Sequence, residues 1–322
     1  MFTGIFMKFL YLFVFVILTS TYLNADFFDD LNATTTYTKE VSHSFRKATT
    51  QQYYRFLWMV DSYFSDNPDN NLTAYEKIRK NKMLVVFSLK DGKTLNLHLR
   101  GRVELPRLKN RLELTFSQQD NQEIDNQSAS TGYDDVVNDK NLRIGLKYYL
   151  YKEKRSSAYA KLSMKVSSHF GPYVKFGIDK SYLSDTLLET SFRNALYYFM
   201  NGNDLSASTE VTFYKPLTTN YWLGQGNKLY WEGQEKLYLS NNIILYQVLD
   251  INNRIAYRTD ITTSYHHEKH FAHESANFSI GYFHRFDKYF FIEAVPKFRK
   301  KRENHYKSET LFTLNVGMLL GK

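Results

Sequence analysis

The chain has no cysteine among its 322 residues. This absence excludes a disulfide framework and any thiolate metal site. Long apolar runs are scarce as well, because Phe9–Leu18 is the one such run in the sequence. A membrane-spanning helix needs about 20 apolar residues, so the sequence excludes helical spans beyond this first run.

The start of the chain has the pattern of a targeting segment. Lys8 precedes the apolar run, and Leu23-Asn24-Ala25 follows it with a small residue suited to cleavage. This order predicts a signal peptide over residues 1–25, with Met7 as an alternative start. The alternative is a membrane anchor, for which the run is short.

Aromatic residues are abundant, at 17% of the chain, although the mean hydropathy is −0.48. Transmembrane barrels place aromatic rings at both membrane interfaces, where an amphipathic ring suits the headgroup layer. An exported, aromatic-rich β-sandwich is the soluble alternative. Strands that recur with one apolar face would favour the barrel. Lipid then covers that face, whereas a sandwich needs a second sheet to cover it.

Residues 94–105 alternate strictly between apolar and polar side chains. The apolar set is Leu95, Leu97, Leu99, Val103 and Leu105, and the polar set is Asn96, His98, Arg100, Arg102 and Glu104. Since strand side chains point alternately to opposite faces, this period predicts a strand and argues against a helix. The pattern recurs to the end of the chain, in segments of about ten residues separated by turn formers, as in transmembrane β-barrels.

We expect fourteen strands, near residues 82–90, 94–105, 110–118, 140–151, 157–166, 172–180, 189–200, 204–215, 218–230, 235–248, 252–265, 274–286, 289–299 and 307–320. The connections at Asp91-Gly92-Lys93 and around His169 are weak signals, so twelve strands is the alternative. An even number places both barrel termini on the periplasmic side. The longest polar connection, 118–139, then faces outward, where barrels keep their long loops.

Residues 26–80 differ from the rest and form the predicted periplasmic N-terminal segment. Apolar residues from Val41 to Phe64 recur at gaps of three and four, which predicts an amphipathic helix over residues 41–64. The turn formers Ser65–Asn71 end it. Such a helix would cap the periplasmic mouth, plug the lumen or pack against the barrel.

Over residues 82–322 the chain resembles Gram-negative outer-membrane β-barrel proteins with a porin-like layout. The resemblance implies an all-β antiparallel transmembrane barrel of 12–14 strands in the bacterial outer membrane. It also implies a lipid bilayer and lipopolysaccharide as surroundings, and the barrel-insertion machinery as a partner. The chain departs from the class at its end, because Leu319-Leu320-Gly321-Lys322 replaces the usual terminal aromatic and Phe312 is the nearest one.

If the apolar faces point to lipid, the opposite faces line the interior. The basic and imidazole side chains of this set are His98, Arg100, Arg102, Arg111, Arg143, Lys147, Lys161, Lys165, Lys175, Arg193, Arg254, Arg258, Lys297 and Arg299. The acids are fewer: Glu104, Glu113, Asp179, Glu210, Asp260 and Glu293. A basic lumen favours anions, which predicts a non-catalytic structural barrel or passive pore for small, anionic solutes. The alternative is a closed barrel filled by charge ladders.

Catalysis would need a nucleophile beside a base. His273 and Ser275 have the spacing of the histidine–serine pair of outer-membrane lipid hydrolases, but Ala276 displaces the expected asparagine to Asn277. The register predicts that both side chains face the lumen, whereas those hydrolases use the lipid side. The sequence therefore favours a non-enzyme without cofactors, with a lipid hydrolase as the alternative.

Two polar clusters lie where outer loops are expected. His266, His267, His270 and His273 could bind a transition metal, with a solvated loop tip or pH gating as alternatives. The basic run Lys297–Arg302 suits the phosphates of lipopolysaccharide. Nucleic acid is not an expected partner, because the other basic residues are spread along strand faces despite the pI of about 9.2.

Overall fold

The computed structural model describes residues 35–63, 80–104, 111–117, 142–166, 171–184, 187–200, 204–232, 236–266 and 270–321. The chain divides into two compact units, residues 1–80 with 320–322 and residues 81–319. The expected signal peptide and the loop at 118–139 lie outside the described residues.

The first unit contains the helix α2 (Thr35–Tyr63). The helix predicted over residues 41–64 is present and begins earlier. Tyr53 and Leu57, one turn apart on one face, are fully buried. No helix among the described residues is long and apolar enough to span a membrane.

The second unit is built from fourteen strands. They are β1 (Lys82–Lys90), β2 (Thr94–Glu104), β3 (Leu112–Ser117), β4 (Leu142–Lys152), β5 (Ser156–Val166), β6 (Gly171–Leu183), β7 (Glu189–Phe199), β8 (Asp204–Pro216), β9 (Tyr221–Glu232), β10 (Lys236–Val248), β11 (Asn253–His266), β12 (His270–Arg285), β13 (Phe290–Lys301) and β14 (Ser308–Leu320). A short 3-10 helix, η3 (Arg302–Asn304), lies between the last two.

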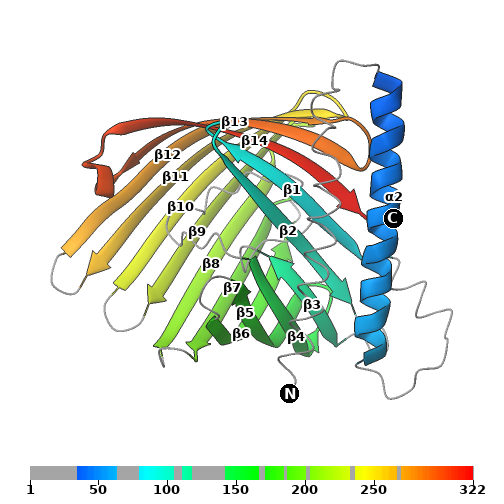
Figure 1. The fold of residues 1–322 in the computed structure, drawn as a ribbon. Helices are drawn as coiled ribbons and strands as arrows, with labels where there is room; N and C mark the ends of the chain where they lie inside the picture. Colours follow the sequence, from blue (N-terminus) through cyan, green and yellow to red (C-terminus); the bar gives the residue numbers. More distant parts are fainter. Residues whose placement is uncertain are drawn as a thin grey trace. The chain divides into compact units, whose positions relative to one another are not determined.

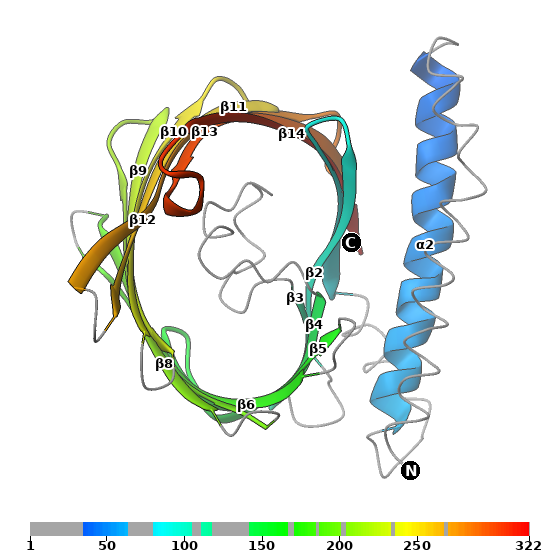
Figure 2. The same cartoon turned by 60° about the vertical axis from the view of Figure 1, so that its left-hand side comes forward.

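These strands form one closed barrel in which each strand pairs with its neighbours in sequence, and β1 closes against β14 (Figures 1 and 2). The fourteen-strand prediction is confirmed, and the twelve-strand alternative is wrong because Asp91 and Gly92 form a true hairpin turn. Both residues have positive φ, 52° and 65°, as the Asp-Gly type I′ turn requires. Asp91 also bonds across the seam, the pairing of β1 with β14 that closes the barrel. Its backbone N–H donates to Phe312 O at 2.8 Å, and its carboxylate accepts from Phe312 N at 2.8 Å.

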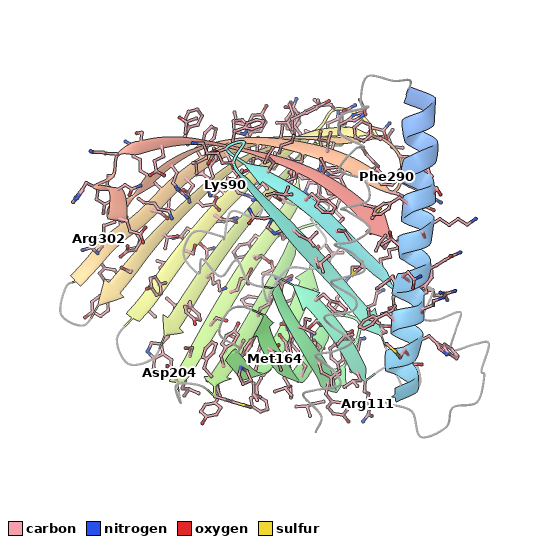
Figure 3. The ribbon with its side chains drawn as sticks, in the orientation of Figure 1. Lys90, Arg111, Met164, Asp204, Phe290 and Arg302 are labelled. Carbon is pink, nitrogen blue, oxygen red and sulfur yellow. The ribbon has the colours of Figure 1, made fainter. Side chains whose placement is uncertain are left out.

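The two faces of the barrel wall differ in polarity, and side chains project from both of them (Figure 3). One face carries large exposed apolar side chains, such as Leu95 at 67% and Ile178 at 60% exposure. On the other face, Lys147 on β4 reaches Asp179 on β6, with a distance of 3.9 Å from Nζ to Oδ2. Side chains of strands that are not neighbours can meet only on the concave side of a barrel. The polar face is therefore the inner face.

The turns at one end of the barrel, where β1 begins and β14 ends, share a side-chain motif. Asp250 Oδ1 accepts from the backbone N–H groups of Asn252 and Asn253 at 2.7 and 2.9 Å. Asp287 repeats this geometry in the β12–β13 turn at 2.6 and 2.9 Å. Thr218 does so through its hydroxyl in the β8–β9 turn. Such side-chain acceptors stabilise tight turns and fix the hairpin register.

The register shifts at two places that the alternation does not predict. One shift lies between Tyr149 and Tyr151 opposite β5, and the other lies between Thr262 and Thr263 opposite β12. In the second, Ser275 pairs with Thr262 and His273 pairs with Thr263, so Glu274 is the extra residue of a β-bulge. In a regular strand, residues two positions apart share a face. A bulge between them places them on opposite faces.

The inner face is not polar throughout. Leu84 and Val86 of β1 form a buried cluster with Phe283 of β12 and Phe291 of β13. The rings of Phe283 and Phe291 lie 5.0 Å apart. This apolar cluster occupies the end of the barrel that carries the tight turns, because β1 begins and β12 ends there.

Candidate functional site

The strand register shows where the expected interior residues lie. Glu104 pairs with Glu113, Glu113 with Lys147, Lys147 with Lys161, and Lys161 with Lys175, so these residues share the inner face. The same holds for His98 and Arg100 on β2, for Arg254, Arg258 and Asp260 on β11, and for Glu293 and Lys297 on β13. Arg111 directly precedes β3 and its carbonyl accepts from Tyr149 N. The backbones of Arg102, Arg143 and Lys165 fall on the same face by register, but their side chains lie outside the described residues.

Three of these residues form what we term the lysine row, Lys147, Lys161 and Lys175. They are direct cross-strand partners on β4, β5 and β6. Their exposed fractions are 8%, 5% and 1%. Neighbouring strands lie about 4.8 Å apart, and like charges directly opposite one another are destabilising. The row therefore needs compensating contacts.

Tyrosine rings supply part of this compensation. Lys147 Nζ lies 3.6 Å from the ring centroid of Tyr159 and 4.6 Å from that of Tyr149. Lys175 Nζ lies 5.0 Å from the ring of Tyr197. The negative face of an aromatic ring attracts an ammonium without contributing a formal charge.

Acidic side chains lie at the edge of the row, where Asp179 Oδ2 is 3.9 Å from Lys147 Nζ. Glu113 is fully buried and accepts hydrogen bonds from Tyr149 Oη at 2.9 Å and Lys152 Nζ at 3.2 Å. Lys152 also donates to Glu104 at 3.0 Å. One lysine thus bridges the two cross-strand glutamates and removes their mutual repulsion.

Two glycines give these side chains room. A Cβ at Gly145 would lie 2.5 Å from both Lys161 Cε and Ser163 Oγ. A Cβ at Gly177 would overlap the ring of Tyr159. Lys161, Ser163 and Tyr159 therefore lie directly over bare backbone, and a side chain at either glycine would require them to shift.

The wall formed by β11–β14 and β1 has a different character. The Arg254 guanidinium lies 4.2 Å from the ring centroid of Phe283. Beside it, Ser88 Oγ donates to Asn315 Oδ1 at 2.5 Å, and Asn315 Nδ2 donates to Glu293 Oε2 at 3.0 Å. Glu293 thus has a hydrogen-bond donor within the wall, whereas the buried Nε and Nη2 of Arg254 have no hydrogen-bond partner among the described residues.

The expectation that His273 and Ser275 share the inner face is wrong. The bulge at Glu274 places them on opposite faces: Ser275 is 4% exposed on the inner face, whereas His273 is an exposed partner of Thr263. A nucleophile and a base on opposite faces cannot contact each other, so this pair does not form a hydrolase site.

The expected metal cluster is described only at His273. His267 and the side chains of His266 and His270 lie outside the described residues. Within the part of the chain that the structure describes, no group of three or more histidine, aspartate or glutamate side chains is arranged to hold a metal.

The sequence analysis did not identify the tyrosines whose rings contact the inner lysines. The signal is a lysine and a tyrosine two positions apart, which places both on one strand face. It occurs as Lys147 with Tyr149, Tyr159 with Lys161, Tyr173 with Lys175 and Lys228 with Tyr230.

A closed antiparallel barrel with an apolar outer face and a polar inner face defines the class of bacterial outer-membrane β-barrel proteins, and the chain has this fold. Similar solved structures include the KdgM porin (7% identity, TM-score 0.37, covering 74% of this chain and 98% of that one). The outer membrane channel DcaP of Acinetobacter baumannii is similar at 8% identity and TM-score 0.42, covering 74% and 95%. OmpT of Vibrio cholerae is similar at 7% identity and TM-score 0.43, covering 74% and 95%. No protein-family model and no curated protein matches the sequence.

Proposed function

We propose that the protein is a passive, non-catalytic pore of the bacterial outer membrane for small solutes, with a preference for anions. The supporting observation is the excess of basic residues on the inner face of β2–β6. The described basic side chains there are Arg100, Lys147, Lys152, Lys161 and Lys175, against the acids Glu104, Glu113 and Asp179. The backbones of Arg102, Arg143 and Lys165 fall on the same face by register. Lysine and arginine rings raise the local anion concentration and select for anions.

Planar-bilayer recordings test this function. With a potassium chloride gradient across the membrane, the reversal potential should shift toward the chloride equilibrium potential. A cation-selective reversal potential would contradict the anion preference. Recovery of the protein in the soluble periplasmic fraction, without heat-modifiable gel mobility, would contradict the membrane barrel.

Export and surroundings belong to the same proposal. Cleavage after residue 25, delivery by the barrel-insertion machinery and contact of the Lys297–Arg302 run with lipopolysaccharide follow from the sequence pattern. Amino-terminal sequencing of the protein isolated from outer membranes tests the cleavage. An intact residue 1–25 segment would favour an anchor.

A closed barrel without conduction is the second candidate. The observation that favours it is the apolar cluster of Leu84, Val86, Phe283 and Phe291 on the inner face. Apolar constrictions can stop ion flow by excluding water. Absence of conductance from a correctly folded barrel would select this candidate over the pore.

A further inference from the structure

We propose that the inner face of β4–β8 carries a binding site for an acidic oligosaccharide, centred on the lysine row. This inference rests on the proposed function, because the ligand would reach the row from the lumen. It goes further by naming the chemistry of one ligand: a linear chain that bears both repeated anionic groups and hydroxyls.

The first argument is charge. Lys147, Lys161 and Lys175 are immediate cross-strand partners, an arrangement that is destabilising for like charges. Their backbone positions repeat at about the strand spacing of 4.8 Å. A ligand with several linked anionic groups matches such a row better than a single small anion, because it contacts more than one ammonium at once.

The second argument is how the ammonium groups are held. Tyr159 and Tyr149 bind Lys147 through their ring faces, and Tyr197 binds Lys175 in the same way. A ring contact adds no formal negative charge, so these tyrosines position the lysines without neutralising them. Lys147 Nζ also lies 3.9 Å from Asp179 Oδ2. The contacts fix where an anionic ligand meets the row.

The third argument comes from hydroxyl groups. Ser163 and Ser206 are each 1% exposed, and neither Oγ has a hydrogen-bond partner among the described residues. Ser163 follows Lys161 by two residues on the same face, and Ser206 is the cross-strand partner of Tyr197. Buried hydroxyls are normally satisfied, so both point to a polar ligand. Sugar hydroxyls can donate to and accept from them, which an inorganic anion does less completely.

The fourth argument is that glycine holds this arrangement in place. Lys161 and Ser163 lie over Gly145, and Tyr159 lies over Gly177. A side chain at either glycine would displace groups of the proposed site while leaving the net charge unchanged. The site can therefore be altered by shape alone.

The test is binding of a linear glucuronic acid oligomer and of the neutral glucose oligomer of the same length. Titration calorimetry on the purified full-length barrel measures affinity, and block of single-channel current measures residence in the lumen. We expect the acidic oligomer to bind and block, and the neutral one to do so much more weakly. Lys161→Gln should weaken acidic binding about tenfold, since it removes a charge-assisted hydrogen bond.

Lys297→Gln is the matched control, because it removes the same charge from the inner face of β13. It should leave binding within about twofold of the wild type, since β13 is at least five strands away from each of β4–β8 around the closed barrel. Gly145→Ala should weaken binding without any change of charge. Heat-modifiable mobility of each variant confirms that it has folded.

Equal binding of the two oligomers would overturn the proposal, and so would equal effects of Lys161→Gln and Lys297→Gln. The pore and the site can fail separately. Calorimetric binding without conductance would contradict the pore and keep the site. Conductance without calorimetric binding of the acidic oligomer would contradict the site and keep the pore.

Discussion

At the scale of single residues, glycine decides which side chains fit inside the barrel. Gly317 of β14 pairs with Phe291 of β13, and the Phe291 ring lies over the bare Gly317 backbone. The ring thereby reaches Leu84 and Val86 in the apolar cluster. Gly145 and Gly177 do the same for the lysine row, so the same device supports both an apolar and a charged inner surface.

Gly317→Ala should therefore destabilise the barrel by about 1–3 kcal/mol, because the new methyl group forces the Phe291 ring from its place. Urea unfolding of the barrel in detergent, followed by tryptophan fluorescence, measures the change. The double variant Gly317→Ala with Phe291→Ala removes the clash, and the two substitutions should be strongly non-additive. Additive effects would show that the ring adapts without cost.

The Asp250 turn predicts an effect of pH. Hydrogen bonds from the Asn253 side chain and from the Asn252 backbone N–H lower the pKa of the Asp250 carboxyl. A lowered folded-state pKa gives stability that is present above the unfolded-state pKa of about 3.9 and is lost as the pH falls through the folded-state value.

Asp250→Asn should then lower the urea midpoint at neutral pH, and the difference from the wild type should shrink in strong acid, below the folded-state pKa. Asp250→Ala, which also removes the acceptor for the Asn252 and Asn253 N–H groups, should be less stable than Asp250→Asn. A difference that grows toward acid would contradict the assignment.

At the scale of elements, the alternation of apolar and polar residues predicted most of the strands, because a period of two has the same meaning in each of them. β1 is an exception, since Met83–Phe87 are all apolar. The alternation does not reveal where a β-bulge lies. Nothing in the residues His273-Glu274-Ser275 indicates that Glu274 is extra, since the reason lies in pairing with Thr262 and Thr263 on β11. The lysine row has the same limit: three lysines far apart in sequence become neighbours only when the register is known.

Adjacent residues of β13 should therefore report opposite environments. Lys297→Cys lies on the inner face, whereas Phe298→Cys lies on the outer face, where Phe298 is 53% exposed. In membranes, a charged thiol reagent should label Lys297→Cys and leave Phe298→Cys unlabelled until detergent is added. The cysteine-free parent chain is a clean background for this measurement. Equal labelling of both would contradict the assignment of faces.

At the scale of the whole barrel, closure removes every free strand edge among the described residues. The apolar outer face and the fully paired backbone together meet the requirement of a hydrocarbon environment, where unpaired N–H and C=O groups are costly. The sequence predicted this architecture from its repeats. It did not predict the apolar cluster inside, because Leu84, Val86 and Phe291 carry no signal that distinguishes an inner from an outer position.

Removal of residues 308–322 should abolish the compact, heat-modifiable form on gels, because loss of β14 exposes the edges of β1 and β13. A short polar extension after Lys322 is the control and should leave that form intact. A truncated chain that still resisted detergent would indicate that thirteen strands can close.

The order of strand pairing also predicts which contacts form early and which form late during folding. Each pairing except one joins strands that are consecutive in the chain, and these hairpins have short connections apart from β3–β4, where residues 118–141 intervene. The exception is the seam, where Asp91 meets Phe312 across 221 residues. Loop-closure entropy opposes that contact until the intervening hairpins have shortened the effective distance between the two strands. The Asp91–Phe312 contact at this seam is therefore expected to form last and to open first, and hydrogen exchange at Phe312 N–H would time both events.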